Sequence, residues 1–469
     1  MKKGDGPMTT GVPTLAFNLT PAPLRASPDI LAEYDAIAGR EVEETRLAPR
    51  VAMAIEDALS QAGWPVGRVC GPEAVLADNF DVSVRVMRQA FRILELRGAC
   101  RPRRGASGGL IVLAPDRTTI AAAMANHLRW TGVSDDEIWA ARDFIEPLAA
   151  ASAARASGRE EATAHPSVAA LASPFLGLSL ACLDQFDGGL SSAPAELTRA
   201  MGAAVEAGAC EQAFDLARES VRARRRSNGP MVSPSAPSFS GAGVGLNLAA
   251  SVAARIGAEI RPEACRSRDR LGSVWTLSER YGVSPGVMIE AVRLLEDAGV
   301  AESVKGRGGG VRLRLPDAAA IITTVHGYLA ARDAASEAEL CFQLNTWSAE
   351  RSADMRSNAD VAAFDLLWRL IEAAPEPTVM RTWYAMQRRM YEIAGNQPLH
   401  LLAVCFADFT VRNKAPMRRP SDPGFIGGIR EAGRTIFRGV AERDGRLARQ
   451  GHDRARAILI PGPARLLRA

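Results

Sequence analysis

An internal repeat constrains the fold of this chain more than any other feature of its sequence. Residues 71–116 align with residues 272–317 without a gap, and each residue of the second stretch is numbered 201 higher (272 minus 71) than its counterpart. The identities that recur are Leu76, Val82, Ser83, Val86, Met87, Ala90, Arg92, Leu94, Glu95 and Gly98, as Leu277, Val283, Ser284, Val287, Met288, Ala291, Arg293, Leu295, Glu296 and Gly299. An unbroken register over this length indicates a duplication, so both copies are expected to form the same kind of unit.

The first copy has the pattern of a helix, a tight turn, a second helix and a β-hairpin. Residues 72–79 suit a short amphipathic helix, and Ser83 is a favourable N-cap for the next one. Apolar residues of the second helix recur at helical spacing: Met87, Ala90, Phe91 and Leu94. Gly98 suits the left-handed position after a helix, and a basic, glycine-rich hairpin follows up to residue 113.

This order of elements predicts a winged helix-turn-helix. In that motif the start of the second helix reaches base edges in the major groove, and cations on the wing neutralise phosphates. The DNA-binding residues that we predict in this copy are Ser83, Arg85, Arg88, Gln89, Arg101, Arg103, Arg104 and Gly105. The alternative is an amphipathic helix whose arginine face is merely solvated beside a glycine-rich hairpin.

The same stretch resembles the DNA-binding domain of the GntR family of bacterial transcription regulators. The resemblance rests on Glu73, Leu76-Ala77 and Phe80, on DVSVRVMRQAFRILELRG (residues 81–98) and on the wing RPRRGASGG (residues 101–109). It implies a regulator that binds operator sites in double-stranded DNA.

The second copy lacks the side chains that would read bases. The counterparts of Val84, Arg85, Arg88 and Gln89 are, in order, Pro285, Gly286, Ile289 and Glu290. Each arginine–guanine pair contributes ~1–3 kcal/mol of discrimination between bases, so their loss is expected to be decisive. We therefore predict a degenerate winged helix, in which Lys305 and Arg307 of the wing remain able to contact phosphate.

Helical patterns without strand-like alternation follow both copies. We predict a mainly α fold with small β wings, in which two winged helix-turn-helix domains are each followed by an all-α helical bundle. The expected parts are a flexible arm (1–40), the first winged helix (41–116), a truncated bundle (117–226), a linker (227–245), the degenerate winged helix (246–317) and a second bundle (318–469). Capping boxes open both bundles, at Ser134 with Glu137 and at Ser336 with Glu339.

A winged helix followed by such a bundle is similar to the FadR-type branch of the GntR family, whose bundle binds a small effector. Residues 142–157 and 380–402 carry this second resemblance. It implies effector contacts at Arg142, Glu161, His165, Gln387 and Asn396, and an effector that is a metabolite carboxylate.

Bundles of this branch often hold a divalent metal through one Asp and three His. The aligned positions in the second bundle are Trp383, Gln387, Gly433 and Ala455, and His452 lies about one turn away. In the first bundle only Glu161 and His165 remain, and two ligands hold a metal poorly. His165 is better explained as a surface or capping residue, and we expect no metal and no other cofactor.

Composition narrows the function classes further. The net charge is only +4, so affinity for nucleic acid must come from a local cluster of cations. The seven cysteines are scattered without a CxxC motif, which is typical of free thiols in a reducing compartment. No apolar run approaches the ~20 residues of a membrane helix, and the N-terminus lacks the apolar core of a signal peptide. We expect a cytoplasmic protein, and no catalytic motif points to an enzyme.

Together these patterns predict a transcription regulator that binds operator DNA through the first winged helix and responds to a small molecule. The two halves are expected to pair as an internal pseudo-dimer, and two chains to form a homodimer on a palindromic site. The alternative is a structural or protein-interaction scaffold whose winged helices no longer bind DNA specifically.

Overall fold

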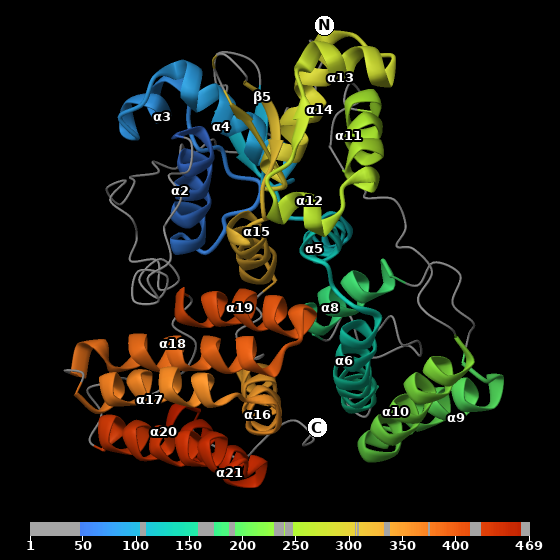
Figure 1. The fold of residues 1–469 in the computed structure, drawn as a ribbon, viewed down its shortest axis with the longest axis vertical. Helices are drawn as coiled ribbons and strands as arrows, with labels where there is room; N and C mark the ends of the chain where they lie inside the picture. Colours follow the sequence, from blue (N-terminus) through green and yellow to red (C-terminus); the bar gives the residue numbers. More distant parts are fainter. Residues whose placement is uncertain are drawn as a thin grey trace, which may run out of the picture.

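The computed structural model describes residues 47–103, 109–157, 173–186, 193–228, 239, 247–304, 306, 309–332, 338–373, 376–412 and 424–460. This part of the chain is mainly helical and contains two small antiparallel sheets, in agreement with the predicted mainly α fold with small β wings. Two units with hairpins lie at one end of the molecule and two groups of helices at the other (Figure 1). No helix among the described residues is both long and apolar enough to cross a lipid bilayer.

The first helix–hairpin unit comprises α2 (Leu47–Gln61), α3 (Glu73–Asn79), α4 (Val84–Leu96), β1 (Cys100–Arg103) and β2 (Gly109–Val112). Ser83 caps α4 as predicted, because its Oγ accepts the Val86 N–H at 3.3 Å. Gly98 follows the helix with a φ of 68°, the left-handed conformation that glycine adopts without strain. The apolar stripe of α4 is buried, and Met87 and Leu94 have no exposed surface.

The second helix–hairpin unit comprises α11 (Asn247–Glu259), α12 (Pro262–Arg266), β3 (Arg270–Gly272), α13 (Val274–Tyr281), α14 (Pro285–Asp297), β4 (Ala301–Val304) and β5 (Gly310–Leu313). Helix α14 and strands β4 and β5 begin and end 201 residues after α4, β1 and β2. This is the same offset as that of the aligned sequences. The strand β3, which the hairpin prediction omitted, pairs with β5 in the order β3-β5-β4. A single bridge between Val69 and Ile111 occupies the equivalent place in the first unit.

Helices make up the described parts of both bundles. The first half contributes α5 (Arg117–Thr131), α6 (Asp135–Ser157), α8 (Pro174–Asp184), α9 (Ala195–Glu206) and α10 (Cys210–Ser227). The second half contributes α15 (Ala319–Ala330), α16 (Ala338–Met355), α17 (Asn358–Ala373), α18 (Glu376–Ala394), α19 (Gln397–Arg412), α20 (Phe425–Glu442) and α21 (Gly445–Leu459).

Two details of these helices bear on the sequence patterns. Helices α9 and α10 are separate, because Gly208 turns the chain between them with a φ of 68°. Helices α20 and α21 are separated at Asp444, whose side chain caps α21 by accepting the Leu447 N–H at 3.0 Å. Ser336, from the second predicted capping box, lies outside the described residues.

Each helix–hairpin unit packs on the first bundle helix of the opposite half. The Trp64 ring of the first unit lies against α15 at Gly327, where an added Cβ would be 2.4 Å from the ring. In the second unit, the Gly257 carbonyl accepts a hydrogen bond of 3.0 Å from Trp130 Nε1 of α5. Figure 1 shows α15 beside α2 and α5 beside α12. The two halves are therefore crossed rather than stacked in sequence order.

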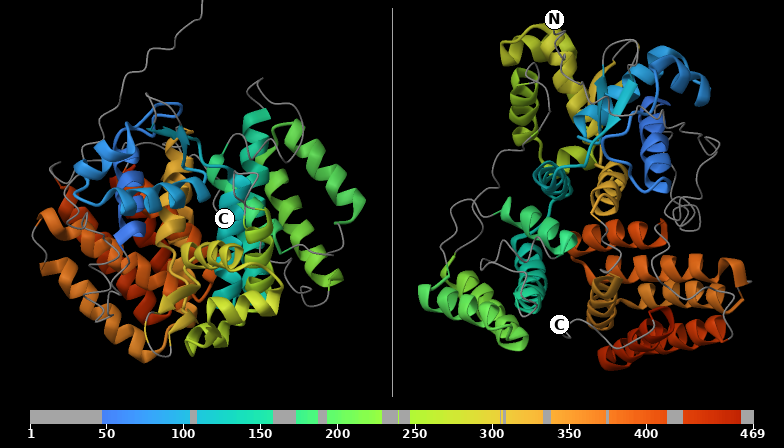
Figure 2. Two further views of the ribbon diagram at one scale, coloured as in Figure 1. Left: turned by 90° about the horizontal axis from the view of Figure 1, so that it is seen from above. Right: turned by 180° about the vertical axis from the view of Figure 1, so that it is seen from behind.

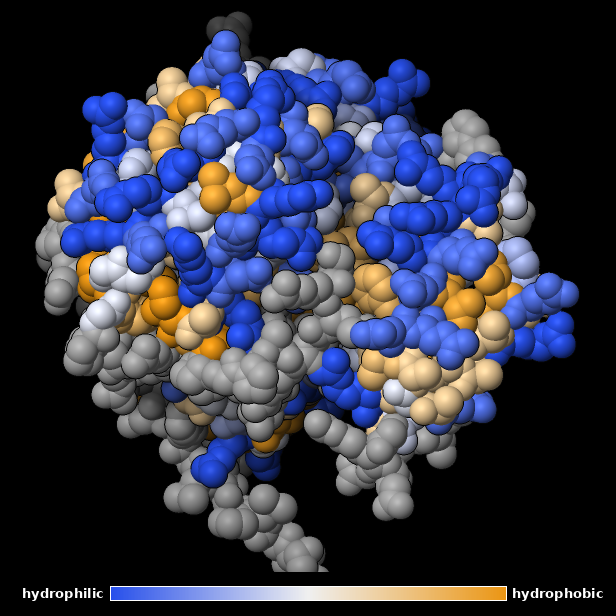
Figure 3. All heavy atoms as spheres, turned by 90° about the horizontal axis from the view of Figure 1, so that it is seen from below, coloured by the Kyte–Doolittle hydropathy of each residue, from blue (hydrophilic) through white to orange (hydrophobic). Residues whose placement is uncertain are grey.

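The two bundles also share one hydrophobic core. Ile120, Met124 and Phe175 of the first half belong to the same buried cluster as Val325, Leu402 and Phe406 of the second. The rings of Phe175 and Phe406 meet edge to face, with centroids 4.8 Å apart. The views in Figure 2 show the two sets of helices side by side. Seen from below, most of the coloured surface of the molecule is hydrophilic and apolar residues form separate patches (Figure 3).

A single carboxylate caps helices of both halves. Glu137 Oε2 accepts the Ser134 N–H at 2.9 Å, which confirms the predicted capping box. Glu137 Oε1 accepts the Gln397 N–H at 2.9 Å, at the start of α19 in the second half. Asn396 adds a hydrogen bond of 2.8 Å to the Glu137 carbonyl oxygen. The ends of α6 and α19 are thus held together by polar contacts that replace water at both helix N-termini.

The crossed packing predicts the effect of a methyl group at Gly327. We expect Gly327→Ala to lower the free energy of unfolding by roughly 1–3 kcal/mol, because the Trp64 ring must leave its place on α15. Gly427→Ala is the matched control, since a Cβ at this position of α20 meets no atom within 4 Å. The control should raise stability by up to about 1 kcal/mol through helix propensity. Urea unfolding of both variants measures the difference, and equal effects would contradict the crossed contact.

Candidate nucleic-acid interface

The first half of α4 presents polar and cationic side chains to solvent. Arg85, Arg88 and Gln89 are exposed, whereas Met87 and Ala90 on the opposite face are buried. This division follows from helical periodicity, which turns every third or fourth residue to the core. Ser83 precedes the helix in an extended conformation, and its Oγ accepts the Val86 N–H of the first turn. The predicted base-reading residues of the first unit therefore share one exposed surface.

The cations on this surface have only weak partners. Arg88 Nε lies 3.0 Å from Glu73 Oε1, and the Arg88 side chain is 71 % exposed. Arg92 lies 3.6 Å from Glu95, and its side chain is 45 % exposed. Exposed ion pairs contribute at most ~1 kcal/mol, so these arginines can exchange their partners for a phosphate or a base.

The hairpin extends the cationic surface away from α4. In its register Arg101 faces Ile111 and Arg103 faces Gly109, and both arginines are exposed. Gly109 is required there, because an added Cβ would lie 2.3 Å from the carbonyl oxygen of Gly71. Arg104 and Gly105, which the sequence also assigned to DNA, lie outside the described residues.

The equivalent surface of the second unit has a different chemistry. Ile289 is 41 % exposed and Trp275 is 70 % exposed, near the start of α14 and α13. Glu290 makes ion pairs of 2.8 Å with Arg293 and 3.8 Å with Arg92 of the first unit. The Glu290 carboxylate thus lies between the two units and pairs with one arginine of each. Lys305 and Arg307, the predicted phosphate contacts, lie outside the described residues.

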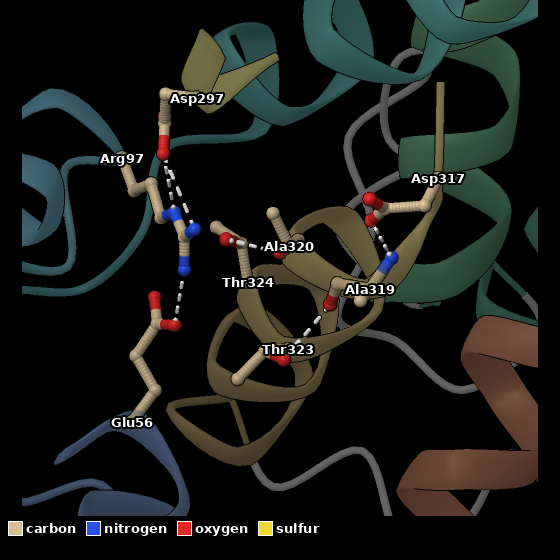
Figure 4. A network of polar contacts seen from close by, with 8 residues as sticks. All are labelled: Glu56, Arg97, Asp297, Asp317, Ala319, Ala320, Thr323 and Thr324. Carbon is tan, nitrogen blue, oxygen red and sulfur yellow. Dashed lines mark hydrogen bonds and ion pairs between the residues drawn. The ribbon is translucent and has the colours of Figure 1, made fainter. Parts of the chain in front are cut away.

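A buried ion cluster joins the C-terminal ends of α4 and α14 (Figure 4). Arg97 Nη1 donates to Glu56 Oε2 at 2.7 Å, and its Nε and Nη2 donate to Asp297 Oδ1 at 3.3 and 3.2 Å. Glu56 has no exposed surface and Arg97 is 8 % exposed. Two carboxylates of opposite halves therefore share one largely buried guanidinium.

The charges of this cluster do not balance when all three groups are ionised. Burial raises the pKa of the Glu56 carboxyl to about 7, although Arg97 opposes the rise. Burial also raises the pKa of Asp297. Burial alone would lower the pKa of Arg97, but its two carboxylate partners hold it above the ordinary value. The cluster therefore favours binding one proton between its carboxylates near neutral pH.

Sequence reasoning missed this cluster, although the repeat contains a signal for it. At the offset of the repeat, Glu56 corresponds to Gly257 and Arg97 corresponds to Ala298. Charged residues in one copy that have small uncharged counterparts in the other indicate an asymmetric contact. A cavity of about 90 Å³ adjoins the cluster, between both units and helices α5 and α15. It has room for a few water molecules. Asp317 at its edge accepts the Ala319 N–H at 3.1 Å, at the start of α15 (Figure 4).

The predicted effector contacts lie in separate environments. Arg142 is 1 % exposed and holds the first bundle together, with Glu146 at 2.7 Å and the Leu183 carbonyl oxygen at 2.8 Å. Asn396 caps α19 by accepting the Leu399 N–H at 2.9 Å. Gln387 is 5 % exposed, and neither its amide oxygen nor its amide nitrogen has a hydrogen-bond partner among the described residues. Glu161 and His165 lie outside the described residues.

Aromatic rings fill the space where the resemblance would place a metal. Gly433 accommodates Trp368, whose ring would lie 2.8 Å from an added Cβ, and Trp383 is 2 % exposed beside it. His452 is fully buried against Trp383, and burial lowers the pKa of His452 to about 3. Indole and amide groups are not metal ligands of this kind. Among the described residues, no three His, Cys, Asp or Glu side chains gather closely enough to hold a metal.

Comparisons with known proteins add little to this geometry. No family model matches the chain, and no curated protein matches it. Among solved structures the chain is similar to Streptococcus agalactiae GntR, with 18 % sequence identity and a TM-score of 0.35. That similarity covers 44 % of this chain and 96 % of the other chain. A TM-score of this size establishes neither family nor function.

The ion cluster predicts how stability depends on pH. The pKa of Glu56 rises from 4.5 to about 7 on folding, so the folded protein binds this proton more tightly than the unfolded chain. The contribution of this proton to the free energy of unfolding is complete below pH 4.5 and is lost as the pH rises through 7. We expect Glu56→Gln, which stays neutral, to unfold at higher urea concentration than the wild type at pH 8 and to lose this advantage at pH 5. Asp78→Asn, at an exposed carboxylate of the same unit, is the control. Parallel pH profiles for wild type and Glu56→Gln would contradict the assignment.

Proposed function

We propose that this chain is a DNA-binding transcription regulator of the GntR type, whose first helix–hairpin unit is a winged helix-turn-helix that binds operator DNA. The observation that carries the proposal is the exposed cationic surface of this unit, with Arg85 and Arg88 on α4 and Arg101 and Arg103 on β1. A regulator of this kind has no catalytic step and acts in the cytoplasm, where the DNA is.

The chemistry of the surface fits the two tasks of such a domain. Arg85 and Arg88 lie at the exposed start of α4, where a guanidinium can donate two hydrogen bonds to guanine. Arg101 and Arg103 lie on the hairpin, where cations neutralise phosphates without reading sequence. The exposed pair with Glu73 is worth at most ~1 kcal/mol, less than the ~1–3 kcal/mol of a guanine pair. Arg88 is therefore expected to leave Glu73 when DNA binds.

The second unit is proposed as a degenerate winged helix that arose by tandem duplication. The recurrence of helix and strand bounds supports a common origin, and the loss of arginines at Gly286 and Ile289 supports a single specific reader per chain. The shared bundle core and the ion cluster support an internal pseudo-dimer of FadR-type halves. One chain then supplies one specific half-site contact.

A small effector is proposed for the second bundle. Gln387 and His452 are buried there, and neither side chain has a hydrogen-bond partner among the described residues. Buried polar groups without partners cost free energy, and a polar ligand or water would satisfy them. These two residues support binding of a small polar molecule, for which the resemblance suggests a carboxylate.

A protein-interaction scaffold is the second candidate function. The ion pair of Glu73 and Arg88 in the first unit has apolar counterparts, Val274 and Ile289, in the second. Trp275, the residue after Val274 on α13, is also exposed. Exposed aromatic and aliphatic side chains favour contact with protein over contact with phosphate. A scaffold would show no salt-dependent, sequence-selective retention on DNA.

Replacement of the two α4 arginines tests the main proposal. We expect Arg85→Ala with Arg88→Ala to weaken operator binding by about 2–6 kcal/mol in total and to relax sequence preference, because base contacts are lost. The matched control combines Arg280→Ala and Arg293→Ala, two exposed arginines of the second unit. Titration against operator fragments selected from genomic DNA, at several salt concentrations, measures both effects. If the control pair weakens binding as much as the first pair, the assignment to α4 is wrong.

The number of chains on a palindrome tests the pseudo-dimer. With one specific reader per chain, two equally protected half-sites require two chains, so we expect light scattering of the complex to give a homodimer on DNA. A site with only one intact half-site should bind one chain. A single chain that protects both half-sites equally would contradict the degenerate role of the second unit.

A further inference from the structure

A groove of about 760 Å³ lies between the two bundles. Helices α6 and α10 of the first half form one wall, and α16 with the turn between α18 and α19 forms the other. Its lining includes Trp139, Asp143, Arg222, Arg225, Trp347 and Arg351. Pockets that bind small molecules usually measure about 300–1,000 Å³, so the groove has the size of a ligand site. Of the described residues predicted from the sequence to contact an effector, Asn396 alone lines this groove.

Three arginines and three carboxylates line the groove, and the contacts between them are exposed or long. Arg225 pairs with Asp136 at 2.7 Å, but the two side chains are 52 % and 85 % exposed. Arg222 Nε is 3.7 Å from Asp143 Oδ1, beyond hydrogen-bond distance. Arg351 is exposed, and no described residue makes an ion pair or hydrogen bond with it. A planar guanidinium without a partner is suited to bind a carboxylate through two hydrogen bonds.

Aromatic side chains stand beside these cations. Trp347, four residues before Arg351 on α16, lies one helical turn away on the same face. Its ring packs on Phe144 of α6, with centroids 6.1 Å apart, so its position is set by both halves. Trp139 of α6 is 4 % exposed and lines the opposite wall. Indole faces favour planar apolar groups.

Taken together, the geometry points to a ligand that is both aromatic and anionic. We propose that this groove binds a small arene carboxylate, with its carboxylate on Arg351 and its ring beside Trp347. The ligand would touch both bundles next to the Glu137–Gln397 contact and so strengthen the junction of the halves. This site is separate from the buried Gln387 and His452, which do not line the groove. The proposal does not depend on whether the protein binds DNA.

Binding of 1-naphthoate to the full-length protein tests the proposal. Isothermal titration calorimetry should give one saturable site per chain. 1-Naphthalenemethanol keeps the ring without the charge, and acetate keeps the charge without the ring, so both should bind far more weakly. Arg351→Gln should weaken naphthoate binding about tenfold or more, as expected for loss of a charge-assisted pair. Arg369→Gln is the control, because Arg369 is 73 % exposed on α17 and does not line the groove.

A second pair of variants distinguishes this groove from the interior of the second bundle. Trp347→Leu should also weaken naphthoate binding, whereas Gln387→Leu should leave it unchanged. Thermal unfolding of each variant without ligand verifies its fold. No saturable binding, equal losses in Arg351→Gln and Arg369→Gln, or loss only in Gln387→Leu would each overturn the proposal.

Discussion

The arrangement of the two helix–hairpin units depends on one guanidinium shared by two carboxylates. Arg97 follows α4, and its partners Glu56 and Asp297 belong to α2 and to α14 of the other half. Removing a buried cation would leave two uncompensated carboxylates, which is far more costly than loss of a surface pair. Since the predicted base-reading residues stand at the other end of α4, the cluster sets the direction in which that surface points.

The two copies of the repeat differ most where they meet and where they face outward. Arg97 and Glu56 have uncharged counterparts in Ala298 and Gly257, so the contact between copies is asymmetric. Two identical subunits related by a twofold axis must place the same residues on both sides of their contact. Two fused halves with different sequences can instead form an asymmetric contact of this kind. The proposed fusion and the proposed loss of a second DNA-binding surface are therefore compatible: one chain keeps both units packed together, while only the first unit has Arg85 and Arg88.

Local features were predictable from sequence, and contacts between distant segments were not. The Ser83 cap and the Ser134–Glu137 capping box depend on neighbouring residues, and the structure confirms them. The exposure of Arg85 and Arg88 follows from helical periodicity in the same way. The second role of Glu137 at Gln397 depends on which surfaces meet, which no local pattern encodes. Arg142 and Asn396 were assigned by resemblance to an effector site, and their hydrogen bonds to the Leu183 and Glu137 carbonyl oxygens were not predicted.

The crossed packing also has a consequence for the order of events during synthesis. Trp64 leaves the ribosome 263 residues (327 minus 64) before Gly327, the glycine on which its ring rests. At ~5–20 residues per second, this interval is roughly 13–50 s. During that time the first unit can form its own helices and hairpin, but one face of its core remains exposed to solvent. The N-terminal helix–hairpin unit is thus synthesised first, and its core is covered only after α15 has been made.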